Sequence, residues 1–146
     1  MAKSQWVQAI AFSITANTDR YKVLSSSIAV ATFSTTEVSA NISCERQLTF
    51  SKLCVVITTN SKTLSNPTIK FRNNGADTAL VTTIPASTTG HFSNTVNTVS
   101  IINGDDLNYR FSAGGAGTFA VRRVVTAFTK DAPSSTGINR MMLMYF

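Results

Sequence analysis

The fold is decided by residues 68–128, which read TIKFRNNGADTALVTTIPASTTGHFSNTVNTVSIINGDDLNYRFSAGGAGTFAVRRVVTAF. In this stretch, short runs of alternating apolar and polar residues are separated repeatedly by turn signals. Ile69 and Phe71 alternate with polar neighbours, which is the period of a strand with one buried face. Asn74-Gly75 follows, and Asn-Gly is a strong hairpin signal because both residues tolerate positive φ. The stretch therefore predicts antiparallel strands joined by tight turns.

The same pattern continues to the end of this stretch. Leu80, Thr82 and Ile84 share one face of a run that stops at Pro85, because proline cannot donate to a sheet ladder. Two later runs flank the turn at 103–105, and their apolar faces are formed by Val99, Ile101, Leu107, Tyr109 and Phe111. A glycine-rich segment over 113–117 and a last run over 118–128 complete the set.

The first sixty residues carry similar signals more loosely. Three runs place apolar residues on one face, and these residues are Trp6, Ile10, Phe12 and Ile14, then Val38, Ala40, Ile42 and Cys44, then Leu53, Val55 and Ile57. No segment shows sustained helical spacing. Strand-like runs recur at roughly 8–12-residue intervals, which is typical of a sandwich or barrel. We therefore predict an all-β fold of about eight to ten strands.

Length and composition indicate one globular domain over residues 1–146. Hydrophobic residues make up 43% of the chain and charged residues only 14%. Ser, Thr and Asn replace the missing charge, which suits strands and tight turns rather than disorder. No apolar run approaches the roughly 18 residues of a membrane span. The short apolar stretch near the start is interrupted by polar residues and lacks a cleavage site, so we expect no signal peptide.

The net charge of +6 raises the question of a polyanionic partner. The 13 Lys and Arg residues are scattered, and only Arg122 and Arg123 are adjacent. Aromatic residues do not interleave with them in a stripe, so we expect no direct binding of nucleic acid. A basic protein that sits on an acidic protein shell has the same net charge.

The sequence offers little for catalysis or metal binding. His91 is the single histidine, and with Cys44 and Cys54 it gives at most three soft ligands, too few for a closed zinc site. Asp105-Asp106 is the single adjacent acidic pair, and we assign it to turn capping because Asp bonds nearby backbone in turns. We therefore expect no enzyme activity, no cofactor, no metal site and no small-molecule substrate.

The last residues depart from the pattern. A turn-rich segment follows Lys130, and Met141–Phe146 is a run of six apolar residues. One interpretation is a final strand in the core of its own subunit, and the other is an arm buried against a neighbouring chain. Methionine slightly favours the second, because it adapts to irregular surfaces. We treat residues 1–5 and 130–146 as arms suited to intersubunit contacts.

The order of turns and strands over residues 68–128 supports a resemblance. An Asn74-Gly75 turn, the sequence IPASTTG, and a Gly104-Asp105 turn followed by LNYRFSAGG resemble the small jelly roll of trimeric phage structural proteins. Head decoration (cement) proteins and tail-fibre tips use this domain, which is related in shape to tumour-necrosis-factor-like domains. The resemblance implies a single antiparallel jelly-roll β-sandwich, and it rests on turns rather than on catalytic residues.

What the resemblance implies about function is a structural role in a phage particle. We expect a capsid decoration protein that is made in the bacterial cytoplasm, binds the outer surface of the head as a homotrimer and stabilises it. The major capsid protein is the expected partner. The alternative is a receptor- or glycan-binding module of a tail fibre. The residues expected at the interfaces are Trp6, Arg122, Arg123, Met141, Met142, Leu143, Met144, Tyr145 and Phe146.

Overall fold

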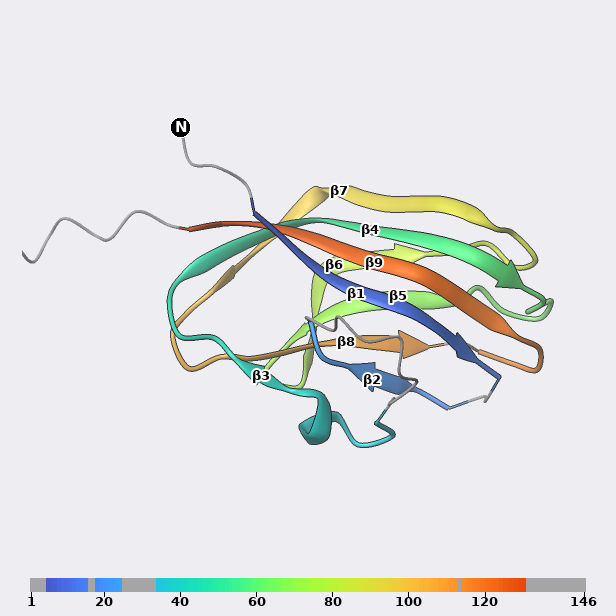
Figure 1. Cartoon of the computed structure of the whole chain (residues 1–146), viewed down its shortest axis with the longest axis horizontal. Helices are drawn as coiled ribbons and strands as arrows, with labels where there is room; N and C mark the ends of the chain where they lie inside the picture. The colour runs from blue at the N-terminus through green and yellow to red at the C-terminus, as the bar shows by residue number, and fades with distance from the viewer. Residues whose placement is uncertain (1–4, 16–17, 25–33, 113, 131–146) are drawn as a thin grey trace, which may run out of the picture.

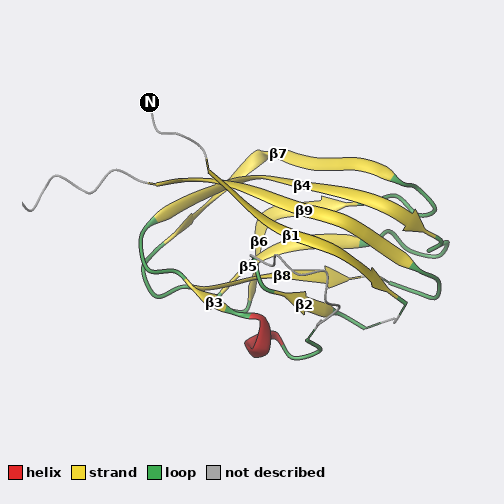
Figure 2. Ribbon diagram, in the orientation of Figure 1, coloured by secondary structure: helices red, strands yellow, loops and turns green. Residues whose placement is uncertain are grey.

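Two antiparallel sheets pack face to face in the computed structural model, which describes residues 5–15, 18–24, 34–112 and 114–130 (Figure 1). Figure 2 shows that strands dominate the described residues. The strands are β1 (Gln5–Ile14), β2 (Arg20–Lys22), β3 (Ile42–Ser43), β4 (Leu48–Asn60), β5 (Thr68–Asn73), β6 (Ala76–Thr83), β7 (Gly90–Ile101), β8 (Asp106–Ser112) and β9 (Phe119–Lys130). A short 3-10 helix, η1 (Glu37–Ala40), precedes β3.

The strand order is that of a jelly roll. One sheet, which we call the β9 sheet, has the order β1-β9-β4-β7. The other, the β8 sheet, has the order β2-β8-β5-β6, and β3 also pairs with β8. Among these neighbours only β5 and β6 are consecutive in the chain, so the chain crosses repeatedly between the sheets, as in a jelly roll. The predicted antiparallel sandwich of eight to ten strands is confirmed.

The core lies between the sheets and uses the apolar faces that the alternation predicted. Ile69, Phe71, Leu80, Ile84 and Phe111 are all 0% exposed. Aromatic rings join the layers, with centroids 4.7 Å apart for Phe50 and Phe71, and 4.6 Å apart for Phe12 and Phe111. Burying each such side chain contributes about 1.5–3 kcal/mol. The sheets are therefore held together mainly by apolar contact.

One polar contact also crosses the core. Tyr109 of β8 and Thr126 of β9 are both fully buried, and their hydroxyl oxygens are 2.6 Å apart. Burial raises the pKa of Tyr109. Because each hydroxyl satisfies the other, neither polar group is left unpaired in an apolar layer.

The two turns that marked the resemblance lie side by side. Asn74 and Gly75 have φ of 48° and 76°, as a hairpin turn with two positive φ values requires. The Asp105 carboxylate accepts hydrogen bonds from the Ile102 backbone N–H at 3.0 Å and from the Asn74 amide at 2.6 Å. Asp105 therefore caps its own turn, as predicted, and also ties it to the Asn-Gly turn.

The predicted strand over residues 38–44 is wrong. Glu37–Ala40 forms η1, and only Ile42–Ser43 pairs with β8. Val38 is 76% exposed, so its apolar side chain is not the start of a buried face. The reason is Glu37, whose carboxylate accepts two hydrogen bonds from Arg72 and draws this segment over the outer face of the β8 sheet.

Candidate interface

A β-bulge sets the position of the only adjacent arginines. In β9, Arg123 pairs with Val56 of β4 and Val121 pairs with Ile57, so Arg122 is an extra residue. Neighbouring residues of a regular strand point to opposite faces, but a bulge breaks that alternation. Arg122 and Arg123 are accordingly both exposed. The bulge thus presents two positive charges on the outer face of the β9 sheet.

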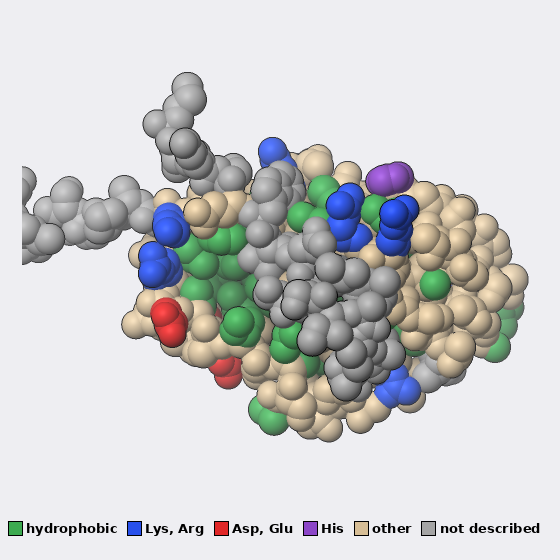
Figure 3. Space-filling model, viewed as in Figure 1, with side chains coloured by type: hydrophobic (Ala, Val, Ile, Leu, Met, Phe, Trp, Pro, Cys, Tyr) green, Lys and Arg blue, Asp and Glu red, His purple; other side chains and the backbone are tan. Residues whose placement is uncertain are grey.

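The outer face of the β9 sheet beside this bulge is mixed in character. Val56 pairs with Arg123 on one side and with His91 of β7 on the other, which makes a row across the sheet. Cys54 and Val125 form the neighbouring pair and are half-buried. Figure 3 shows basic side chains gathered beside a histidine on this side of the molecule. We call Cys54, Val56, Arg122, Arg123 and Val125 the bulge surface.

A pocket of about 460 Å³ opens at the end of the sandwich where β1 begins and β9 ends. We call it the end pocket. Its wall is apolar and comes from both sheets, from Leu24, Leu48, Phe50, Leu107 and Phe128. Its rim carries Gln5, Ile42, Ser43, Cys44, Glu45, Arg46 and Lys130. Figure 3 shows hydrophobic side chains gathered at this end of the molecule.

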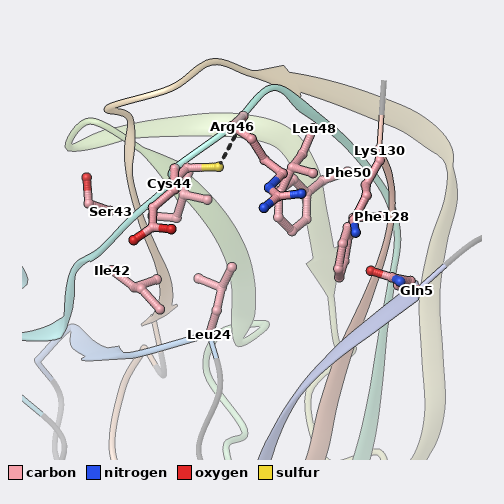
Figure 4. A pocket seen from close by; sticks show the side chains of 12 residues that line it. Gln5, Leu24, Ile42, Ser43, Cys44, Arg46, Leu48, Phe50, Phe128 and Lys130 are labelled. Carbon is pink, nitrogen blue, oxygen red and sulfur yellow. Dashed lines mark hydrogen bonds between the residues drawn. The ribbon is translucent and has the colours of Figure 1, made fainter. Parts of the chain in front are cut away.

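The rim of the end pocket is charged. Figure 4 places Arg46, Lys130 and Gln5 on one side of the pocket, and Ser43 and Ile42 on the other. Within the described ranges, neither Arg46 nor Lys130 forms an ion pair. The Cys44 thiol donates a hydrogen bond to the Arg46 carbonyl at 3.0 Å, which holds this loop at the mouth. The end pocket therefore combines an apolar interior with charged groups at its opening.

A network of ion pairs covers the outer face of the β8 sheet. Arg72 of β5 donates to both Glu37 carboxylate oxygens, at 2.7 and 2.9 Å, and also to Asp77 and to the Gly75 carbonyl. Lys70 and Arg110 also reach Asp77, at 2.6 and 3.2 Å.

The pKa values follow these contacts. The hydrogen bond from Arg72 lowers the pKa of Glu37. Burial of Asp77 opposes ionisation, yet its hydrogen bonds from Lys70 and Arg72 lower the pKa to about 2. Both carboxylates are therefore committed to holding η1 and β6 against β5, and we assign the network a structural role.

A buried lysine lies at the opposite end of the sandwich. Lys62, in the loop after β4, is 0% exposed and donates to the Gly115 carbonyl at 2.7 Å. Burial lowers its pKa. Its own carbonyl accepts from the Ser87 backbone N–H at 2.9 Å. Lys62 therefore links the loops over 61–67, 85–88 and 114–117.

A second, polar groove of about 380 Å³ runs between β6 and β7. Residues 95–97 of β7 bulge opposite Lys52 alone, because Ser51 pairs with Thr98 and Leu53 with Asn94. The Asn94 amide donates to the Ala79 and Val81 carbonyls of β6, and the Asn97 amide donates to Ala79. These side chains join the β6 and β7 edges of the two sheets.

The described residues hold no group of three His, Cys, Asp or Glu side chains placed to bind a metal ion. Cys44 is buried, Cys54 is half-buried, and both are free thiols. Burial raises the pKa of Cys54. In the same part of the chain no helix is long and apolar enough to cross a membrane.

The predicted interface residues are only partly described. Arg122 and Arg123 are brought together by the bulge. In β1, the backbone of Trp6 pairs with that of Ala127 in β9. Gln5 and Lys130, which the sequence assigned to arms, belong to β1 and β9. The predicted residues Met141–Phe146 lie outside the described residues.

The sequence missed the end pocket, because its wall is assembled from β4, β8, β9 and the segment after β2, which are far apart in the chain. No family model matches the chain, and no curated protein matches it at a significant level.

Proposed function

We propose that the protein is a structural component of a phage particle that decorates the outside of the head as a homotrimer and stabilises it. The observation that carries the proposal is the bulge surface. Arg122 and Arg123 are exposed together beside half-buried Cys54, Val56 and Val125. Adjacent charge and apolar area on a rigid sheet suit attachment to an acidic protein shell.

The proposed mechanism is contact, without catalysis. Positive charge steers the protein to an acidic shell and fixes its orientation, while the apolar residues beside it exclude water. The resemblance to cement proteins supports the homotrimer and the major capsid protein as partner. In this proposal each subunit bridges neighbouring capsid subunits on the outer surface of the particle.

The test uses phage heads from which the protein has been stripped, with rebinding and head melting as readouts. Arg122→Glu together with Arg123→Glu is expected to weaken rebinding at least tenfold at 0.15 M salt, since rim charges act mainly through such electrostatics. The matched control is Arg46→Glu with Lys130→Glu, which changes the net charge equally and also alters exposed residues, at the end pocket. Heads that lose no stability on stripping and do not rebind the unaltered protein contradict the proposal.

A glycan-binding role is the second candidate, and the polar groove favours it. Its lining combines Thr83, Ser93 and Thr95 with the half-buried ring of Phe92. Hydroxyl groups around an aromatic face are suited to sugars. A glycan array with unaltered protein and with Thr95→Asp tests it. Binding that Thr95→Asp abolishes supports the glycan role, and an array without binding removes it.

A further inference from the structure

The two long sides of the sandwich differ in how the edges of the two sheets are joined. On one side Asn94 and Asn97 of β7 bond to the carbonyls of β6 and join the two sheets. On the other side β1 is the edge of the β9 sheet, and β2 and β3 lie at the edge of the β8 sheet. The end pocket opens between these edges, since its lining includes Gln5 of β1, Ile42 of β3 and Leu24 just after β2.

The end pocket has room for an apolar occupant. Leu24, Leu48, Phe50 and Leu107 are each at most 9% exposed, and Phe128 packs against the core with its ring centroid 5.5 Å from that of Phe50. A volume of about 460 Å³ is within the range of pockets that take a ligand or several side chains. Apolar surface left open to water at this end favours association with another apolar group.

The chain itself supplies a suitable group close by. Lys130, the last residue of β9, lines the pocket, and residues 131–146 continue from it. Only residues 131–140 separate Lys130 from Met141. Ten residues span at most about 33–36 Å when extended, enough to leave the mouth and return. Pro133 and Gly137 lie in this connection, and both residue types favour reversals of chain direction.

We propose that the end pocket is the binding site for Met141–Phe146 of the same chain. Every side chain of this segment is apolar over most of its length, so any face suits the pocket wall. Methionine adjusts to an irregular cavity better than branched side chains do. Arg140 then lies at the mouth near exposed Glu45, which forms no ion pair with any described residue.

The tether favours the segment of the same chain over that of a second copy. A short linker gives a local concentration in the millimolar range, far above that of free subunits in a dilute solution. The proposal goes beyond decoration of a phage head, because it holds for the isolated protein. It adopts the first of the two sequence interpretations, in which the apolar run belongs to its own subunit.

Cross-linking to Cys44 tests the proposal directly. With Cys54→Ser as background, the full-length variants Met142→Cys, Leu143→Cys and Met144→Cys cover both faces of the segment. Leu64→Cys is the control, because Leu64 is 87% exposed and lies beyond the opposite end of β4. Isotopically heavy and light chains are mixed at low micromolar concentration, oxidised with diamide and digested, and the linked peptides are weighed.

The expected result is a disulfide between Cys44 and at least one segment position, formed at least tenfold faster than with Leu64→Cys. The linked peptides are expected to be wholly heavy or wholly light. Mixed heavy-light peptides overturn the proposal, because they show that the segment occupies a second copy. Absence of any link overturns it too. An equally fast link from Cys44 to Val30→Cys also overturns it, because it assigns the pocket to the apolar run over residues 28–33.

A second measurement needs no engineered cysteine. Cys44 lines the pocket and is 7% exposed, so an occupant shields it further. Leu143→Asp in the full chain is expected to speed alkylation of Cys44 by N-ethylmaleimide at least tenfold. Leu64→Asp, the matched control, is expected to leave the rate unchanged. Equal rates in all three proteins contradict the proposal.

Discussion

Arg72 is the residue whose replacement should report most clearly on the ion network over the β8 sheet. Its guanidinium is buried and holds Glu37 through two hydrogen bonds and Asp77 through one. Arg72→Met keeps most of the side-chain volume and removes the charge. The effect on stability then reflects lost hydrogen bonds rather than a cavity.

The expected loss of stability depends on the hydrogen-bond donors that each carboxylate keeps in Arg72→Met. Glu37 retains the Asn108 amide at 3.0 Å, and Asp77 retains Lys70 and Arg110. Neither carboxylate is left without a partner, so the full cost of about 3–5 kcal/mol for breaking a buried pair is not reached. Counting about 1.5 kcal/mol for each carboxylate that loses a charged donor gives a loss of about 3 kcal/mol.

Urea unfolding at pH 7 measures this loss as a change in the free energy of unfolding. Lys70→Met is the control, because it removes another donor to Asp77 from a pair whose side chains are 24% and 32% exposed. Such pairs contribute about 0–1 kcal/mol. A loss below about 1 kcal/mol for Arg72→Met, or one equal to that of the control, refutes the structural role of the network.

Three further predictions concern pH, a turn and the core. The pKa of Asp77 lies at about 2 in the folded protein, and its ordinary value is 3.8. The contribution of Asp77 to stability is therefore complete above pH 3.8 and is lost as the pH falls through 2. Acid unfolding should be less steep for Asp77→Asn than for the unaltered protein, and identical curves contradict this. Gly117→Ala should lower the free energy of unfolding, measured by thermal unfolding, by about 1–3 kcal/mol more than Gly104→Ala does. Both glycines have positive φ, but an added Cβ at 117 meets a backbone oxygen at 2.6 Å. Equal losses argue against that close approach. Tyr109→Phe should lower the free energy of unfolding in urea by about 1–3 kcal/mol, because it leaves the buried Thr126 hydroxyl unpaired. Adding Thr126→Val to the same chain should recover part of this loss.

Alternation correctly predicted which face of the central strands is buried, because burial there comes only from packing against the opposite sheet. Ile69, Phe71 and Leu80 each face the opposite sheet, and nothing else competes for them. Alternation also puts Arg72 on the outer face of the β8 sheet, opposite Phe71, but it does not predict that Arg72 is buried there. Burial of Arg72 depends on Glu37, 35 positions away, and that partner is not visible in a local pattern.

The candidate interface was less predictable than the fold. That Arg122 and Arg123 are adjacent was plain from the sequence, but the alternation of a regular strand puts them on opposite faces. The bulge that exposes both depends on how β9 aligns with β4 and β1, which is set by contacts between distant segments. The strand expected over 38–44 was wrong for a similar reason, since the contact that holds Glu37 of η1 to Arg72 of the β8 sheet joins residues 35 positions apart.

The pairing of β1 with β9 has a consequence for how the protein is made. Among the described strands, β1 is the first along the chain and its one ladder partner, β9, is the last. Ile14 and Phe119 are paired but 105 positions apart (119 minus 14). At about 5–20 residues per second, a ribosome needs roughly 5–20 s to cover that distance. During this time β1 has no ladder partner among the described strands, and the β9 sheet cannot be completed until synthesis has passed Lys130.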